Sequence, residues 1–212
     1  MTELPGGVER RRVDGDEGLA TRGEPVYGEP YDGEWRRWDP HRSKVGAMIE
    51  SGLETGVAEG DGVLYLGAAN GTTASHVADF AGPVYAVEFA PRPMREFVGV
   101  AEGRANLFPL LKDARKPETY AHVVEANLDC IVQDVATTGQ ARVANLNRRF
   151  LADDGRLLLA LKARSEDVTR EPETVFQESL ETLREEYEVL DTARLNPYHG
   201  DHFAAVATPR SE

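Results

Sequence analysis

Cysteine is almost missing from this 212-residue sequence, in which Cys130, within the apolar run LDCIV, is the only one. A lone cysteine can form neither an intrachain disulfide nor a cysteine-based metal cluster, so both are excluded and no metal site is predicted. We expect Cys130 to be a small side chain buried in the core.

Long apolar runs are absent as well. No stretch approaches the roughly 18 consecutive apolar residues that suggest a membrane-spanning helix. The amino-terminal segment MTELPGGVERRRVDGDEG is charged rather than apolar, unlike a secretory signal peptide. We therefore expect a soluble, cytoplasmic protein with no membrane contact.

Lysine is scarce too. Acidic residues outnumber basic ones by 37 to 24, and the lysines among the basic residues are Lys44, Lys112, Lys116 and Lys162. This composition resembles that of proteins from salt-loving archaea, in which a carboxylate-rich surface keeps the protein hydrated; an acidic mesophilic enzyme of small substrates is the alternative. At about 1 M salt the screening length is only about 3 Å, so the net charge of −13 does not exclude an RNA partner.

Apolar runs alternate with amphipathic ones from about residue 41 onward, whereas residues 1–40 are rich in glycine, proline, arginine and acids. Residues 1–40 are predicted to form a short β hairpin region or a partly ordered arm, and residues 41–212 a single α/β domain. Strands are predicted over 63–66, 83–88, 106–111, 128–134, 156–162, 187–194 and 202–207, and helices over about 72–81, 92–101, 139–151 and 172–186, after a first helix that starts at Asp39 and Pro40. This alternation predicts a Rossmann-like, seven-stranded, mainly parallel sheet whose last two strands form an antiparallel edge hairpin.

Glycine or charged residues follow five of the predicted strands. Gly67 to Gly71 follow the first strand, and Glu88, Asp113, Asp134 and Lys162 follow or end the next four. In a doubly wound sheet the ligand lies outside the carboxyl ends of the strands, where the topology switches direction. We therefore predict a nucleotide-like ligand at this edge of the sheet.

The segment VLYLGAANGTT, residues 63–73, does not contain the G-x-G-x-x-G pattern of NAD-binding folds. Carboxylates attract a sulfonium cation and repel a pyrophosphate. An acid-lined pocket without the dinucleotide pattern therefore favours S-adenosylmethionine. Glu88, which follows Gly67 by 21 residues, is suited to ribose hydroxyls, and Asp113 is suited to an adenine amino group.

Seven segments between residues 34 and 207 match the motifs of one family in order and spacing: EWRRWDPHRSKVGAMI, VLYLGAANGTTASHVAD, VYAVEFAPR, LLKDARKP, QDVA, LLLALKAR and PYHGDHFAAV. They resemble fibrillarin, the ribose 2′-O-methyltransferase of box C/D ribonucleoproteins, in its archaeal form. The resemblance implies S-adenosylmethionine-dependent methylation of rRNA and tRNA. It also implies that a box C/D guide RNA selects the target, that a Nop-domain scaffold protein recruits the enzyme, and that a kink-turn-binding protein of the ribosomal type organises the RNA.

The resemblance further implies a catalytic set of two lysines, an aspartate and a histidine, which by motif are Lys44, Asp134, Lys162 and His202. The residues alone do not distinguish His202 from the neighbouring His199. We expect Lys162 to contact the ribose hydroxyl and Asp134 to orient it, while Lys44 and His202 complete the polar network. Which group takes the proton stays open, although arginine could not replace a lysine as a proton acceptor because its guanidinium keeps its proton.

The predicted cofactor contacts are the turn after the first strand and residues near the later strand ends: Gly67, Ala68, Ala69, Asn70, Gly71, Thr72, Thr73, Glu88, Phe89, Asp113, Ala114, Asp134 and Gln140. The family has a glutamine where this chain has Thr137, and Gln140 follows close by. Two alternatives remain. A methyltransferase of small molecules or proteins would share the turn without needing two lysines, and a structural subunit of a ribonucleoprotein would keep only the shape.

Overall fold

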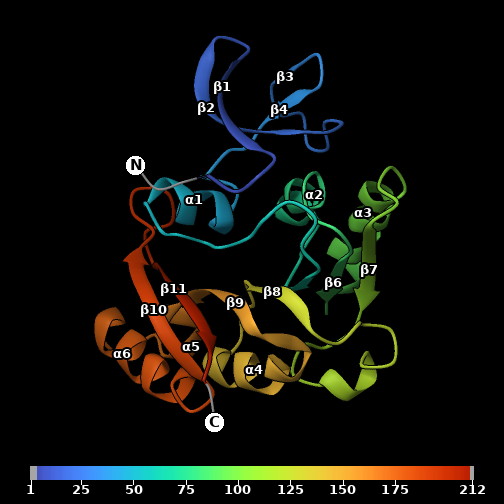
Figure 1. Ribbon diagram of the computed structural model, residues 1–212. Coiled ribbons are helices and arrows are strands. Elements are labelled where there is room, and N and C mark those ends of the chain that lie inside the picture. Colours follow the sequence, from blue (N-terminus) through green and yellow to red (C-terminus); the bar gives the residue numbers. More distant parts are fainter. Residues whose placement is uncertain (1–3, 211–212) are drawn as a thin grey trace.

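The computed structural model describes residues 4–210, which form a seven-stranded sheet flanked by helices and a smaller four-stranded sheet (Figure 1). The larger sheet consists of β5 (Val63–Leu66), β6 (Val84–Glu88), β7 (Leu107–Leu111), β8 (Leu128–Gln133), β9 (Leu151–Lys162), β10 (Tyr187–Arg194) and β11 (His202–Pro209). The strand order is β10-β11-β9-β8-β5-β6-β7. Strands β5 to β9 are parallel, and β11 runs antiparallel to both β9 and β10, which confirms the predicted Rossmann-like sheet with an antiparallel edge hairpin.

The direction of the sheet topology switches between β5 and β8. The chain runs outward from β5 through β6 to β7 and then crosses back to place β8 on the other side of β5. In open sheets of this kind a ligand binds outside the carboxyl ends of the strands at the switch. The residues that follow β5 and β8 therefore border the expected site.

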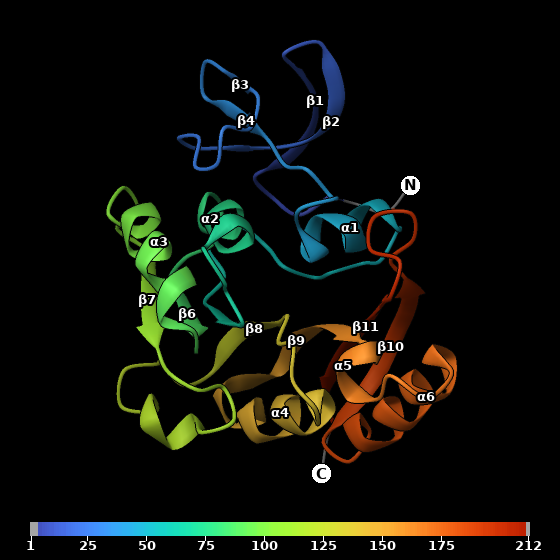
Figure 2. The ribbon, with the colours of Figure 1, turned by 180° about the vertical axis from the view of Figure 1, so that it is seen from behind.

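Helices cover both faces of the sheet (Figures 1 and 2). One face is covered by α1 (Lys44–Glu50), α2 (Thr72–Ala78) and α3 (Pro91–Ala101), and the other by α4 (Gln140–Asn147), α5 (Ala163–Glu166) and α6 (Pro172–Leu183). Short 3₁₀ turns lie at Pro117–Thr119 and Arg148–Phe150. Within residues 4–210, none of the helices has the length and apolar character needed to cross a membrane.

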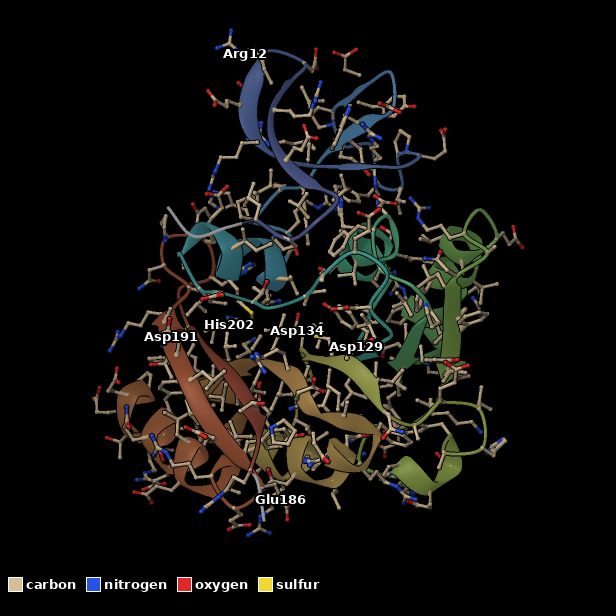
Figure 3. The ribbon with its side chains drawn as sticks, in the orientation of Figure 1. Arg12, Asp129, Asp134, Glu186, Asp191 and His202 are labelled. Carbon is tan, nitrogen blue, oxygen red and sulfur yellow. The ribbon has the colours of Figure 1, made fainter. Side chains whose placement is uncertain are left out.

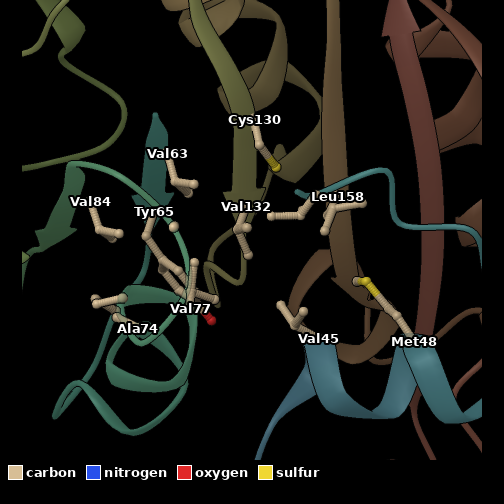
Figure 4. Close-up of a cluster of buried hydrophobic side chains, with 14 of the residues drawn as sticks. Val45, Met48, Val63, Tyr65, Ala74, Val77, Val84, Cys130, Val132 and Leu158 are labelled. Carbon is tan, nitrogen blue, oxygen red and sulfur yellow. The ribbon is translucent and has the colours of Figure 1, made fainter. Parts of the chain in front are cut away.

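The core of the α1 side is an apolar cluster between the sheet and α1, α2 and α3, part of which is shown in Figure 4. Successive strand residues point to opposite faces, so Val63 and Tyr65 of β5 join this cluster while Leu64 and Leu66 pack on the α4 side. Cys130 is fully buried in the same cluster, as predicted, and burial raises the pKa of its thiol.

The smaller sheet contains β1 (Val8–Val13), β2 (Asp16–Arg22), β3 (Tyr31–Asp32) and β4 (Trp35–Arg37), in the order β1-β2-β4-β3. Asp14 and Gly15 both have positive φ, which is the backbone of a tight hairpin turn and explains why the sequence reads Asp-Gly there. This sheet lies next to α1 and α2, on the side away from the seven strands (Figure 1).

A buried ion network joins the smaller sheet to α2. Arg36 of β4 has no exposed side-chain surface and contacts Glu29 and Asp79, in each case at 2.7 Å. The guanidinium also donates to the hydroxyl of Ser75 at 3.0 Å. Since Ser75 lies in α2 and Asp79 directly follows it, the helix that begins at the turn after β5 is fixed to the smaller sheet.

A buried histidine completes this interface. His76 of α2 stacks on Trp38, with 5.1 Å between ring centroids, and its two ring nitrogens contact Thr21 and Tyr27. The Thr21 hydroxyl donates its proton to Asp79, so Nδ1 of His76 carries the ring proton and donates to Thr21. Burial, reinforced by nearby arginines, lowers the pKa of His76 well below its ordinary value, and the ring is therefore neutral.

Several local predictions differ from the structure, among them the predicted helix over 139–151, which ends at Asn147. Helix α1 begins at Lys44 rather than near Asp39, because the hydroxyl of Ser43 accepts from the backbone N–H of Gly46 and caps the helix there. Strand β9 begins at Leu151 rather than at residue 156, since Leu151 pairs with Leu128 of β8. The residues between Leu151 and Arg156 lie in a shift of register, after which Arg156 pairs with Cys130. The one-turn helix α5 was not predicted, because four residues are too few for a periodic pattern.

Candidate active site

The turn after β5 sits directly on the end of β8. Gly67 has φ +84°, and a Cβ added to it would lie 2.4 Å from the carbonyl oxygen of Asp134. Ala69 also has positive φ, and Gly71, with φ +86°, precedes the first turn of α2. Glycine is therefore required at position 67 both for the left-handed backbone and for the close approach of the two strand ends.

A cavity of about 440 Å³, within the usual range for small-molecule sites, opens at these strand ends. Of the predicted cofactor contacts, Gly67, Ala69, Glu88, Phe89, Asp113, Ala114 and Asp134 line it. The cavity is also lined by Thr137 and by six residues that were not predicted as contacts, namely Val87, Lys112, Arg115, Val135, Ala136 and Val143. Most of these are apolar or neighbours of predicted residues, so no chemical pattern distinguishes them in the sequence.

The predicted residues Ala68, Asn70, Gly71, Thr72 and Thr73 belong to the same turn and to the start of α2 but do not line the cavity. The Thr72 hydroxyl donates to the side-chain oxygen of Asn70, and Gly71 approaches the ring of Phe97 too closely for a Cβ. These residues therefore contribute to the conformation of the turn and lie outside the cavity lining.

Two of the cavity carboxylates are held by neighbouring groups. Glu88 accepts from the backbone N–H of Ala69 at 2.8 Å and from that of Ala90 at 2.7 Å, so it links the turn after β5 to the start of α3. Asp113 accepts from the side chain and the backbone N–H of Arg115, and these hydrogen bonds lower the pKa of the Asp113 carboxyl. Both carboxylates are therefore fixed beside the cavity.

The four predicted catalytic residues come from different elements but face the same side of the sheet. Lys44 is the first residue of α1, Asp134 follows β8, Lys162 ends β9 and His202 starts β11. Because strand residues alternate, the burial of Ala160 and Ala204 on the α1 side places Lys162 and His202 on that side too. Figure 3 shows Asp134 and His202 just below α1.

An ion pair joins two of these residues, and the pairing of β9 with β11 joins the other two. The Nζ atom of Lys44 lies 3.2 Å from Oδ2 of Asp134, and each side chain is 23% exposed. Lys162 and His202 are opposite partners in the antiparallel pairing of β9 and β11. Asp134 also lines the cavity, so it connects the cavity to Lys44.

His202 is held in its neutral form. Burial and the charges of Lys44, His199 and Lys162 lower the pKa of His202 to about 4, and its Nδ1 is buried without a hydrogen-bond partner among the described residues. His199 lies beside it, with 5.6 Å between ring centroids, and its Nε2 contacts the carbonyl oxygen of Pro40 at 2.9 Å. Of the two histidines, His202 is the one that pairs with Lys162 across β9 and β11.

Gln140, also predicted as a cofactor contact, is not among the residues that line the cavity. Its side chain is fully buried and lies outside the cavity, where its amide contacts the backbone of Lys162. Val143, one turn further along α4, does line the cavity, whereas the amide of Gln140 is occupied by the Lys162 backbone. Among residues 4–210, no group of three or more histidine, cysteine or acidic side chains is arranged to hold a metal ion.

Comparisons with known proteins agree with this geometry. A family model described as Fibrillarin matches residues 11–211. The fibrillarin-like rRNA/tRNA 2′-O-methyltransferase of Haloarcula marismortui is 66% identical over 209 residues, covering 99% of each chain. A solved structure of Aeropyrum pernix fibrillarin with natively bound S-adenosyl-L-methionine has a TM-score of 0.83 and 43% identity, and covers 98% of this chain and 100% of that one.

A second solved structure, a fibrillarin/Nop5p complex, has a TM-score of 0.90 and 36% identity, and covers 99% of this chain and 100% of that one. The family model begins within β1 and spans the rest of the smaller sheet and all seven strands of the larger one. The matched relatives agree with this chain in sequence, length and fold. This chain therefore belongs to the fibrillarin family.

Proposed function

We propose that Lys44, Asp134, Lys162 and His202 carry out the ribose 2′-O-methylation of rRNA and tRNA, for which S-adenosylmethionine supplies the methyl group. The activity and the methyl donor are those of the relatives described above. The observation that supports the residue assignment is the double position of Asp134, which lines the cofactor cavity and contacts Lys44.

The residues of the cavity fit S-adenosylmethionine. Three carboxylates, Glu88, Asp113 and Asp134, line it, and such a group attracts a sulfonium cation. Phe89 is 66% exposed at its rim and offers an aromatic face. When bound, S-adenosylmethionine supplies an electrophilic methyl group whose departure leaves a neutral sulfide.

The reaction needs a ribose hydroxyl that is oriented, deprotonated and stabilised as negative charge develops on its oxygen. Lys162 contacts this hydroxyl and stabilises the charge, and Asp134 fixes its direction beside the cavity. Lys44 balances the charge of Asp134 at 3.2 Å. His202 stays neutral at neutral pH, so it contributes a hydrogen-bonding ring without adding a third positive charge next to the lysines.

This chain works within a ribonucleoprotein. A box C/D guide RNA selects the target nucleotide, a Nop-domain protein recruits the enzyme, as the fibrillarin/Nop5p complex illustrates, and a kink-turn-binding protein organises the RNA. With a net charge of −13 the enzyme gains little from electrostatic attraction to RNA, so the particle supplies the effective concentration that its own surface does not.

We further infer that residues 1–40 are a short β region attached to a methyltransferase domain formed by residues 41–212. The supporting observation is that the four strands of the smaller sheet end at Arg37, whereas α1, which provides Lys44, begins the elements of the larger unit. Because the relatives are archaeal and the substrates are rRNA and tRNA, we place the activity in the cytoplasm.

The test is guide-RNA-dependent methyl transfer in a reconstituted particle at molar salt, with a labelled methyl donor. For Lys162→Ala we expect a loss of about 100-fold or more in rate, with S-adenosylmethionine binding retained. Lys116→Ala, which removes an exposed lysine, is the matched control and should behave as the wild type. Full activity of Lys162→Ala contradicts the assignment, and absence of cofactor binding by the wild type favours a structural subunit.

A further inference from the structure

We propose that Gln140 is a positioning residue that holds the backbone of Lys162 in place for methyl transfer, a role that rests on the function proposed above. The side-chain amide of Gln140 makes two hydrogen bonds to a single residue. Its Oε1 accepts from the backbone N–H of Lys162 at 3.0 Å, and its Nε2 donates to the carbonyl oxygen of Lys162 at 3.1 Å. Gln140 is fully buried, so water cannot replace these bonds readily.

The end of β9 needs such a partner because its neighbour stops short. The parallel pairing of β8 with β9 ends where Gln133 is opposite Leu159. Lys162 lies three residues beyond Leu159, so no residue of β8 is available to bond its peptide groups on that side. The amide of Gln140 presents one acceptor and one donor, as a further strand residue would, and thereby continues the ladder.

The same arrangement brings Lys162 close to His202. The peptide groups of Lys162 point toward Gln140, and the carbonyl of His202 points the other way and accepts from the N–H of Leu195. Lys162 and His202 are therefore a non-hydrogen-bonded pair of the antiparallel ladder, the type in which facing side chains lie closer together.

Gln140 is itself fixed by two side chains. Glu166 accepts from the backbone N–H groups of Gln140 at 2.6 Å and of Gly139 at 2.7 Å, and so caps α4, which has no cap from its own N-terminal residue. Gln133 donates to the carbonyl oxygen of Gln140 at 2.8 Å. We call Gln133, Gln140, Glu166 and the Lys162 backbone the clasp.

The clasp determines where two catalytic residues lie relative to each other. Gln133 directly precedes Asp134, and Glu166 is one helical turn after Lys162. The segment between Gln133 and Gln140 contains Asp134 to Thr137, which line the cofactor cavity. A displaced Lys162 would face the hydroxyl at the wrong distance, and an error of about 1 Å in such a position lowers rates by about 100-fold.

The sharpest test is Gln140→Glu. A carboxylate at this position can still accept from the N–H of Lys162, but it turns a lone pair toward the Lys162 carbonyl instead of a donor. We expect kcat to fall about 10-fold to 100-fold, with S-adenosylmethionine affinity and the KM for RNA within about 2-fold of the wild type. Gln177→Glu adds the same charge at an exposed position and is the control, with wild-type activity expected.

Acidification provides a readout that a purely structural role would not change. A buried carboxyl beside Glu166 protonates more readily than a free one, and once protonated it can donate to the Lys162 carbonyl again. The activity of Gln140→Glu divided by that of the wild type should therefore rise as the pH falls. Glu166→Gln, which loosens the clasp from its other side, should lower kcat with cofactor affinity unchanged, and it serves if Gln140→Glu does not fold.

Three results would overturn the proposal. The first is wild-type kcat in both Gln140→Glu and Glu166→Gln, and the second is an activity ratio that does not change with pH. The third is a loss of cofactor affinity that matches the loss of kcat, which would make Gln140 a cofactor contact. If the wild type transfers no methyl group, the proposed function fails instead. The clasp is then judged by hydrogen exchange at the Lys162 amide, which should be faster in Gln140→Glu than in the wild type.

Discussion

Replacing Gly67 by alanine should disturb the active site directly, because Gly67 lies against the backbone of Asp134. At φ +84° an alanine is strained by about 1–2 kcal/mol. Its Cβ would also lie 2.4 Å from the carbonyl oxygen and 2.8 Å from the carbonyl carbon of Asp134, so one of the two strand ends must move. Forcing an atom into a packed site costs about 1–3 kcal/mol more. We therefore expect Gly67→Ala to lower the free energy of unfolding by about 2–5 kcal/mol.

Gly15→Ala separates the two contributions. Gly15 has φ +92°, and nothing lies within 4 Å of the added Cβ, so this variant has the strain without the overlap. At about 2–4 °C per kcal/mol for a domain of this size, Gly67→Ala should lower the melting temperature by about 4–20 °C. Gly15→Ala should lower it by less and leave S-adenosylmethionine binding unchanged, whereas Gly67→Ala should weaken binding because Asp134 is displaced. Equal stability and equal cofactor affinity in the two variants would refute the reasoning.

Four further results are expected. Asp134→Asn leaves the ammonium of Lys44 without its partner at 3.2 Å and should lower methyl transfer at least about 100-fold in the labelled-donor assay; a loss below 10-fold would contradict its role. Ser43→Ala removes the cap on the N–H of Gly46 and should cost about 1 kcal/mol in denaturant unfolding, and an unchanged midpoint would argue against the cap. Because the pKa of His76 is lowered on folding, the unfolded chain binds a proton below about pH 6.5 that the folded chain does not. The free energy of unfolding should therefore fall by about 1.4 kcal/mol for each pH unit below about 6.5. The slope should be shallower in His76→Gln. The melting temperature should rise with salt, because a net charge of −13 repels itself in dilute buffer, and a melting temperature independent of salt would count against a halophilic surface.

Buried strands and strand ends were the most predictable parts of the chain. The bounds of β5 agree with the prediction because four buried residues stand between glycines, which is a purely local pattern. The placement of Asp134 and Lys162 at one edge of the sheet follows from the rule that parallel strands end together, and the structure brings both to the α1 side. Local pattern and topology are sufficient for such positions.

Contacts between a side chain and a distant backbone could not be predicted in this way. The amide of Gln140 contacts a peptide group 22 residues away in the sequence. Neither periodicity nor composition predicts that β8 ends before β9 does. The sequence offers more than one residue that could cap α1, and the fold decides which of them does so. Ser43 rather than Asp39 is the cap, because the backbone of Ser43 is extended at φ −134° and its hydroxyl accepts from the N–H of Gly46. These choices are made by tertiary packing.

The buried ion network around Arg36 implies that the amino-terminal strands cannot be trimmed away. Truncation would leave Asp79, only 3% exposed, without its nearest counter-ion, and breaking such a pair by removing one partner costs about 3–5 kcal/mol. Since α2 includes Ser75 and starts at the cofactor turn, the loss would spread to the catalytic end of the molecule. In calorimetry the smaller and the larger sheet should therefore unfold in one cooperative transition, although they are separate sheets.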